Sequence, residues 1–276
     1  MTMSFRGCRE FIANMIHNLR MIIEYDGTNY HGWQRQASPN RDAGDLLRTI
    51  QGTIEDVLSI ITKHPANIVA AGRTDAGVHA MGQVIHFKTT LHINESSWRK
   101  AINSLLPADI VVKSAEYVPD EFNARFDAKS KVYRYIICNS GYQSPFQRNY
   151  VWHKKQHLNI TLMRDASQYL LGHHDFSSFR ASDCSAKSPV KTLDRLEIEE
   201  MLMEGLLLSS SKILIMTFEA RSFLQHMVRN IVGTLAEVGR GKYTPFEIKS
   251  ILEKKDRRYA GPIAPPQGLY LSEVKY

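Results

Sequence analysis

Two short apolar runs near residue 75 are separated by a loop that holds one carboxylate between an arginine and two glycines. Residues 68–71 and 83–87 are typical of short buried strands, and Gly72-Arg73-Thr74-Asp75-Ala76-Gly77-Val78-His79-Ala80 lies between them. Because glycine lets the backbone turn tightly at a strand end, this pattern predicts that Asp75 is presented at the rim of a sheet. For an isolated Arg-x-Asp the simpler interpretation is a turn aspartate paired with Arg73 at the surface.

The first half of the chain alternates strand and helix patterns. Residues 38–45 have the composition of a mobile polar loop. The predicted elements are a strand at 19–24, a helix at 50–61, the two strands beside the glycine-rich loop, a helix whose apolar face bears Trp98, Ile102 and Leu105, and a strand at 110–112.

The second half begins with a β-branched and aromatic run, residues 131–138, that favours a strand. Thr244-Pro245-Phe246-Glu247 has the pattern of a helix start, with a capping threonine, a proline in the first turn and a glutamate three residues on. The other predicted elements are strands at 193–198 and 213–218, a helix with the apolar stripe Leu162, Ala166, Tyr169 and Leu170, and a longer helix with the stripe Phe223, Met227, Ile231, Leu235 and Val238.

Five ordered segments, the glycine-rich loop among them, resemble the signature of the tRNA pseudouridine synthase A (TruA) family. They span about residues 19 to 276, and five blocks in one order are a more specific signal than one nonapeptide. The other four are Glu24-Tyr25-Asp26-Gly27-Thr28-Asn29-Tyr30-His31-Gly32-Trp33-Gln34, Ala124-Arg125-Phe126 with Lys131-Val132-Tyr133-Arg134-Tyr135, Phe223-Leu224-Gln225-His226-Met227-Val228-Arg229-Asn230-Ile231-Val232-Gly233, and Ala264-Pro265-Pro266-Gln267-Gly268-Leu269-Tyr270-Leu271.

The resemblance implies an α+β fold of two ferredoxin-like (RRM-like) halves that share a mostly antiparallel sheet, with helices on one face and a catalytic cleft between the halves. It places the N-terminal half at residues 19–127 and the C-terminal half at 128–276, after an N-terminal extension at 1–18. The family works as a homodimer whose two subunits hold one tRNA, so we expect a homodimer from the resemblance alone.

Pseudouridine formation breaks the bond between ribose C1′ and uracil N1, turns the base and rejoins it through C5. This isomerisation consumes nothing, so no cofactor is expected, and the sequence holds no P-loop, no dinucleotide-binding glycine motif and no C-x-x-C. The reaction needs an ionised carboxylate near the anomeric carbon, as in retaining glycosidases. Asp75 fits that role, either by adding to C1′ or by removing a ribose proton to give a glycal.

Three further residues are predicted to bind the substrate. A carboxylate in a water-poor cleft stays ionised only beside a cation, and Arg229 is the candidate for that cation, with a solvated helix arginine as the alternative. Tyr133 matches the family's base-contacting tyrosine, whose ring gives a flipped uracil a stacking face worth about 1 to 3 kcal/mol; the alternative is a packing role. Arg73 is expected to hold a phosphate or to fill the gap left by the flipped base.

The net charge of +7 and the pI near 9.2 suit a polyanionic partner such as tRNA. Three scattered cysteines form neither a disulfide framework nor a paired zinc set, and no apolar run approaches the length of a membrane span. We therefore expect a cytoplasmic protein without membrane association. His173-His174-Asp175 invites a metal, but adjacent histidines point apart and no third ligand is suitably spaced, so no metal is expected.

The resemblance implies uridines 38, 39 and 40 of the tRNA anticodon stem-loop as targets. A synthase for another RNA or position, and a non-catalytic RNA-binding module, are the alternatives. A phosphotransferase that used Asp75 would need a second acidic residue and a Mg²⁺ site close by, which Ala76, Gly77 and Val78 do not supply. The basic run Lys254, Lys255, Arg257 and Arg258 fits a solvated charged face at least as well as an RNA contact.

Overall fold

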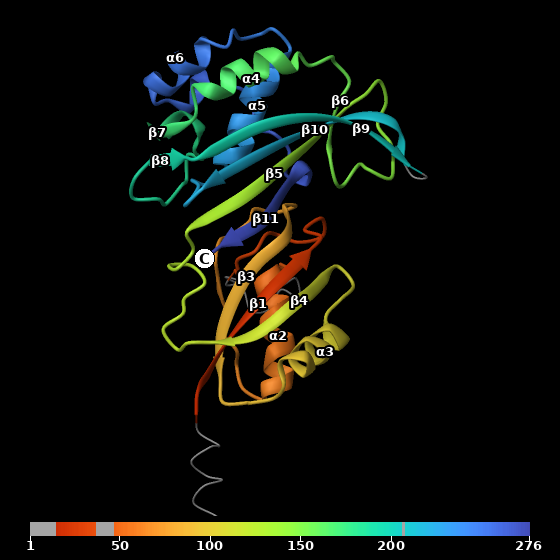
Figure 1. Ribbon diagram of the computed structural model, residues 1–276, viewed down its shortest axis with the longest axis vertical. Coiled ribbons are helices and arrows are strands. Elements are labelled where there is room, and N and C mark those ends of the chain that lie inside the picture. Colours follow the sequence, from red (N-terminus) through yellow and green to blue (C-terminus); the bar gives the residue numbers. More distant parts are fainter. Residues whose placement is uncertain (1–14, 37–46, 206–207) are drawn as a thin grey trace, which may run out of the picture. The chain divides into compact units, whose positions relative to one another are not determined.

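The computed structural model describes residues 15–36, 47–205 and 208–276. The predicted polar loop at 38–45 and most of the predicted N-terminal extension lie outside these residues. Among the described residues the fold is mixed α+β, with five α-helices and mostly antiparallel strand pairing, as predicted (Figure 1). By its internal contacts the chain divides into two compact units: one runs to Ala76 and resumes over Ala80–Ala128, and the other combines Gly77–His79 with Lys129–Tyr276.

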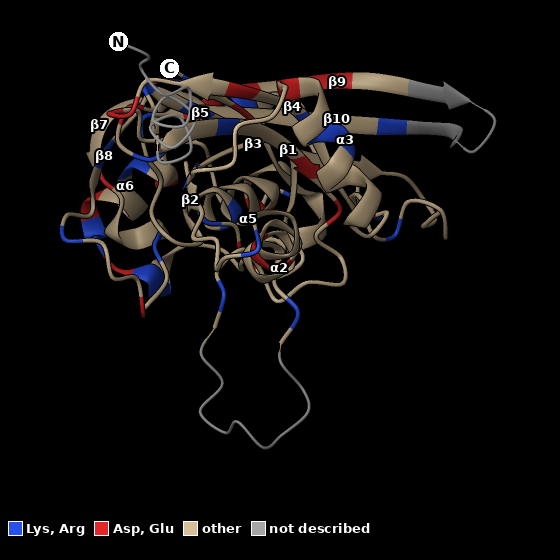
Figure 2. Cartoon of the chain, turned by 90° about the horizontal axis from the view of Figure 1, so that it is seen from below, with Lys and Arg blue, Asp and Glu red and all other residues tan. Residues whose placement is uncertain are grey.

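The first unit is a small sheet with β1 (His17–Tyr25) at its centre, paired antiparallel with β3 (His79–Thr89) and with β4 (Ile110–Val118). The short strand β2 (Val69–Ala70) pairs with β3. Two helices complete the unit, α2 (Ile50–Thr62), which lies beneath the strands in Figure 2, and α3 (Glu95–Leu105). The core forms because alternate residues of β1, among them Leu19, Met21 and Ile23, are fully buried.

The second unit has an antiparallel sheet in the order β11 (Leu269–Lys275), β5 (Ser130–Asn139), β10 (Leu208–Ala220) and β9 (Arg195–Gly205). A short strand, β6 (Trp152–Lys154), pairs with β5 in parallel. The remaining elements are the hairpin of β7 (Gly172–Asp175) and β8 (Val190–Leu193), the helices α4 (Ile160–Gln168), α5 (Met227–Gly239) and α6 (Glu247–Lys254), and three 3₁₀ turns at Ser177–Phe179, Arg257–Tyr259 and Pro266–Gly268.

Thr244 and Glu247 contact each other at the start of α6. The backbone N–H and the hydroxyl of Thr244 both donate to the Glu247 carboxylate, at 2.6 and 2.9 Å. Glu247 in turn donates its backbone N–H to the Thr244 carbonyl. The contact between Thr244 and Glu247 fits the predicted pattern, but α6 begins at Glu247 with Phe246 as its N-cap and without a side-chain cap. The prediction of Thr244 as the N-cap and Pro245 as the first helical residue was therefore wrong.

Three of the predicted helix faces were partly wrong. In α4 the buried positions are Met163, Ala166 and Ser167, whereas Tyr169 is exposed. The reason lies on α5: a Cβ at Gly239 would stand 2.7 Å from the Met163 sulfur, so the glycine makes room for that side chain. Leu105 ends α3 and is also exposed. Phe223 precedes α5, so it does not belong to that helix's stripe.

Candidate active site

The loop that presents Asp75 is held by hydrogen bonds at Thr74 and at Gly72. The Thr74 hydroxyl and the Tyr25 hydroxyl lie 2.8 Å apart and both are buried. The Thr74 carbonyl accepts from the Trp33 backbone N–H at 3.0 Å, and the Gly72 carbonyl accepts from the Gln83 side-chain amide at 2.7 Å. Burial raises the pKa of Tyr25, so its phenol stays protonated and can donate. Asp75 therefore directly follows Thr74, whose side chain and carbonyl are both fixed by hydrogen bonds.

Two glycines shape the same loop. Gly32 has φ of +87°, and a Cβ there would lie 2.9 Å from the Thr74 carbonyl oxygen and 3.1 Å from the Asp75 carbonyl carbon. Only glycine fits so close to this backbone in that conformation. Gly77, two residues after Asp75, has φ of +75° and forms the turn that leads into β3. The strand end thus turns sharply just after the carboxylate, as the sequence predicted.

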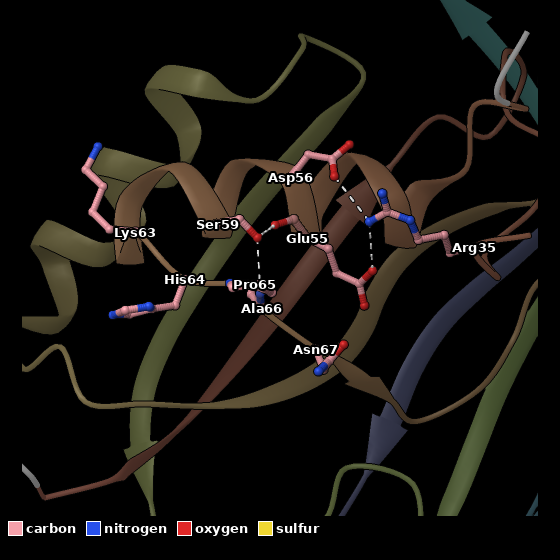
Figure 3. A pocket seen from close by; sticks show the side chains of 9 residues that line it. All are labelled: Arg35, Glu55, Asp56, Ser59, Lys63, His64, Pro65, Ala66 and Asn67. Carbon is pink, nitrogen blue, oxygen red and sulfur yellow. Dashed lines mark hydrogen bonds and ion pairs between the residues drawn. The ribbon is translucent and has the colours of Figure 1, made fainter. Parts of the chain in front are cut away.

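A second network joins the segment after Gly32 to α2. The Gln51 side-chain oxygen accepts from the Gln34 amide at 2.7 Å and from the Arg35 backbone N–H at 3.1 Å, and the Gln51 amide donates to Glu55 at 2.8 Å. Arg35 points at both Glu55 and Asp56, at 3.3 and 3.2 Å, on the wall of an open pocket of about 630 Å³ (Figure 3). Glu55 also accepts from the Ile68 backbone N–H. Since this buried carboxylate is already paired and hydrogen-bonded, its role is structural.

Tyr133 lies on β5 in the second unit, opposite Phe218 of β10 and Leu271 of β11. Its ring meets Phe223 edge-on, with centroids 5.1 Å apart, and its side chain is almost fully buried. Tyr135 has its ring on the same face of the strand and donates to the Pro265 carbonyl at 2.7 Å. The backbone therefore fixes the hydroxyl of Tyr135.

Arg229 forms two hydrogen bonds with Ala264. Its Nε donates to the Ala264 carbonyl at 2.8 Å, and the Ala264 backbone N–H donates to the Arg229 carbonyl at 3.1 Å. Burial raises the pKa of Tyr135, and the charge of Arg229 opposes that shift, which places the guanidinium near the Tyr135 ring. Arg229 is partly buried in the first turn of α5. A fixed, partly buried guanidinium is the kind of group that can keep a carboxylate ionised.

His79 closes the glycine-rich segment inside the second unit, and sequence reasoning gave it no role. Its Nε2 lies 3.0 Å from the Asn149 carbonyl, and its ring stacks on Tyr270 with centroids 4.8 Å apart. Arg73 is exposed in the first unit, as is expected of a residue that contacts RNA or solvent. Among the predicted site residues, Arg73 and Asp75 belong to the first unit, and Tyr133 and Arg229 to the second.

The basic run near the C-terminus is largely occupied within the protein. Arg258 forms an ion pair with Asp256, and Lys255 forms one with Asp175. Arg257 donates to the Asn230 side chain at 3.0 Å, and Lys254 lies 3.9 Å from the centre of the Tyr259 ring. Each of the four cations thus has a partner within the chain, while Lys255 and Arg258 remain 60% and 86% exposed. Acidic residues lie along β9 (Figure 2), and one of them, Glu200, pairs with Lys212 of β10.

His173 and His174, which the sequence analysis weighed as metal ligands, both contact oxygen atoms of the protein. The His173 ring nitrogen contacts the Thr192 hydroxyl, and His174 contacts the Leu171 carbonyl. Over the ranges that the structure describes, no group of three or more His, Cys, Asp or Glu side chains could hold a metal ion. Over the same ranges, none of the helices has both the length and the apolar character needed to cross a bilayer.

Comparisons with known proteins identify the family of the chain. The family model described as tRNA pseudouridine synthase matches residues 21–127 and 166–276. The tRNA pseudouridine synthase A of Alcanivorax borkumensis is 44% identical over 254 residues, which cover 92% of this chain and 89% of that protein. Its counterpart in Thermoanaerobacter sp. (strain X514) is 44% identical over 261 residues, covering 95% of this chain and 100% of that protein.

A third relative, the tRNA pseudouridine synthase A of Buchnera aphidicola subsp. Acyrthosiphon pisum (strain APS), is 43% identical over 265 residues, 96% of this chain and 93% of that protein. Matches of this extent and identity define a family rather than a shared fold alone. The chain belongs to the tRNA pseudouridine synthase A family, which is a family of isomerases.

Proposed function

We propose that this protein isomerises uridine to pseudouridine in tRNA, at positions 38, 39 and 40 of the anticodon stem-loop, with Asp75 as the catalytic carboxylate. The observation that carries the proposal is the fixation of the Asp75 loop: Thr74 is held at its hydroxyl and its carbonyl, and Gly32 packs against the backbone of Asp75 itself. Such fixation suits a nucleophile or base that must meet one atom of a bound ribose.

The proposed reaction keeps every atom of the substrate. The C1′–N1 bond breaks as the Asp75 carboxylate either bonds to C1′ or removes a ribose proton to give a glycal. The uracil turns, and C5 bonds to C1′ as the Asp75–C1′ bond breaks or as Asp75 returns the ribose proton to the glycal. A base then passes the C5 proton to solvent, and N1 takes a proton from solvent. Tyr133 stacks on the flipped base and assists removal of the C5 proton, and Arg229 keeps the carboxylate ionised.

The partner and the setting of the reaction belong to the same proposal. Arg73 holds a phosphate of the tRNA or fills the gap that the flipped base leaves. The protein works as a homodimer in the cytoplasm. Because the chemistry is an isomerisation, it proceeds without an added cofactor or metal.

The test is to incubate the purified protein with unmodified tRNA transcript and to map pseudouridine by carbodiimide labelling and primer extension. We expect stops at positions 38 to 40 of suitable tRNAs. Stops elsewhere would point to another target. No stops, together with tight tRNA binding, would favour a non-catalytic RNA-binding module.

The matching variant is Asp75→Asn, which keeps the shape of the side chain but removes the nucleophilic or basic oxygen. Turnover should fall below a hundredth of wild type while tRNA binding stays nearly intact. Asp56→Asn is the control, because Asp56 is an exposed aspartate of the same unit that pairs with Arg35. Retained turnover in Asp75→Asn would remove Asp75 from the central role.

A further inference from the structure

Two cations of the second unit pair with one buried carboxylate at the end of α5, and a third belongs to the strand that leads toward this end. Arg240 reaches Glu237 at 2.9 Å and Lys242 reaches it at 3.6 Å, while the Glu237 side chain is only 5% exposed. Lys154, at the end of β6, is close enough that both Glu237 and Arg240 act on its pKa. We call Lys154, Arg240 and Lys242 the α5-end cluster. One carboxylate among three cations leaves an excess of about two positive charges.

Stabilisation of the helix does not account for the whole cluster. Cations next to the last turn of a helix interact favourably with its carbonyl end, which explains Arg240 and in part Lys242. Lys154 comes from a separate strand, and burial lowers its pKa, while Glu237 opposes that shift and the charge of Arg240 adds to it. The helix end therefore does not explain the third cation, and the excess positive charge on this partly exposed group favours an anion as its partner.

The cluster is also held in position. The Lys154 ammonium lies 4.4 Å from the centre of the Trp152 ring, a cation–π contact that restricts the side chain. The Asn159 backbone N–H donates to the Gly239 carbonyl, which ties the segment after β6 to the end of α5. Arg240 and Lys242 remain 39% and 59% exposed, so an anion can reach them.

The position of the cluster relates it to the proposed base site. Lys154 pairs in register with Asn139 of β5, which lies on the same face of the sheet as Tyr133. Six residues of strand separate Asn139 from Tyr133, a distance of about 20 Å. Along α5, Arg240 follows Arg229 by eleven residues, a distance of about 16 Å. Both estimates place the cluster about 16 to 20 Å from the proposed base-site residues, a span of several base pairs of an RNA stem.

We propose that the α5-end cluster is a binding site for phosphates of the RNA backbone, about 16 to 20 Å from the flipped base. The inference rests on the proposed function, because it takes Tyr133 as the base contact. Recognition here is electrostatic and independent of base sequence, as is usual for contacts to phosphate. The site anchors the stem of the substrate while the catalytic residues act on its loop.

The test measures tRNA affinity over a series of salt concentrations for Lys154→Gln, Arg240→Gln and Lys242→Gln. Each substitution should weaken binding roughly three- to tenfold and reduce the slope of log K against log salt by about one. Turnover at saturating tRNA should stay at the wild-type level. Lys249→Gln, on exposed α6, removes the same charge elsewhere in the unit and should leave the slope nearly unchanged.

A second arm uses substrate length. A hairpin with only three base pairs cannot span about 20 Å, so wild type and Lys242→Gln should bind it equally. Equal weakening with tRNA and with the hairpin would overturn the proposal, and so would a slope unchanged from wild type. Lys242→Gln, the most exposed substitution, keeps the test valid if Lys154→Gln fails to fold. Affinity is read apart from turnover, so failure of wild type to form pseudouridine would count against the proposed function and not against this site.

Discussion

Gly32→Ala perturbs the proposed catalytic carboxylate from outside the loop that carries it. The new Cβ would stand 2.9 Å from the Thr74 carbonyl oxygen and 3.1 Å from both the Asp75 carbonyl carbon and the Ala76 nitrogen. Ordinary contacts begin near 3.4 Å, so the Thr74 carbonyl must move by about half an ångström. That carbonyl accepts the Trp33 backbone N–H, and Asp75 follows it directly. The movement is therefore passed to the carboxylate.

The size of the effect follows from this displacement. A misplacement of about 1 Å can lower the rate about a hundredfold, so a displacement of about half an ångström should lower kcat roughly tenfold. Alanine at φ of +87° also costs about 1 to 2 kcal/mol of folding free energy, which corresponds to a fall in Tm of roughly 2 to 8 °C. Affinity for tRNA should change less than about threefold, because binding rests mainly on contacts to phosphate.

The assay is release of tritium from tRNA labelled at uracil C5, measured at saturating protein, with thermal melting of the same samples. Gly172→Ala is the matched control: Gly172 has φ of +92°, but a Cβ there meets nothing closer than 3.9 Å. It should lose similar stability and keep the wild-type rate. If Gly32→Ala also keeps its rate within about twofold while its Tm falls, the loop does not transmit the displacement and the reasoning fails.

Three further outcomes are expected. Thr74→Val leaves the buried Tyr25 hydroxyl without this partner, so denaturant melts should show a loss of about 1 to 3 kcal/mol and tritium release should slow; Thr74→Ser should restore both. Tyr133→Phe should bind tRNA but release C5 tritium slowly, whereas wild-type behaviour of Tyr133→Ala would make Tyr133 a packing residue. Burial lowers the pKa of His86, whose Nδ1 accepts the Ala124 backbone N–H. The folded protein thus binds this proton less readily than the unfolded chain, so Tm should fall as pH drops below about 6.5, and less so in His86→Gln.

Local sequence was sufficient for several of the longer elements and for the turn that carries the proposed catalytic carboxylate, but not for β6, the β7–β8 hairpin or β11. Strand and helix periods identified β1, α2, β5 and β10. The glycines around Asp75 predicted a sharp turn, and Gly77 indeed has positive φ. The contact between Thr244 and Glu247 joins residues three apart, so it too could be predicted, although the first residue of α6 was not. These features are set by interactions within a few residues, which a pattern can express.

The sequence alone could not show what fixes that turn. Tyr25 and Thr74 are 49 positions apart, and Asn230 binds the Phe179 carbonyl across 51. Gly32 lies in a block that resembles the family, yet its closeness to Asp75 appears only when β1 and the loop are folded together. Arg229 and Ala264 likewise become partners only in the folded second unit. Such pairings depend on which distant segments the fold brings together, so no periodic pattern in the sequence predicts them.

This dependence on the folded chain also explains the wrongly predicted helix face of α4 and the basic residues whose role the sequence left open. Gly239, on α5, makes room for the side chain of Met163, and α4 buries the face that carries Met163. Whether Lys255 is solvated or engaged was decided by Asp175, 80 residues away in the sequence. Composition determined that the chain is basic and its order of blocks determined its family. Only the tertiary structure decided which cations are already paired, because charges pair through space and not along the chain.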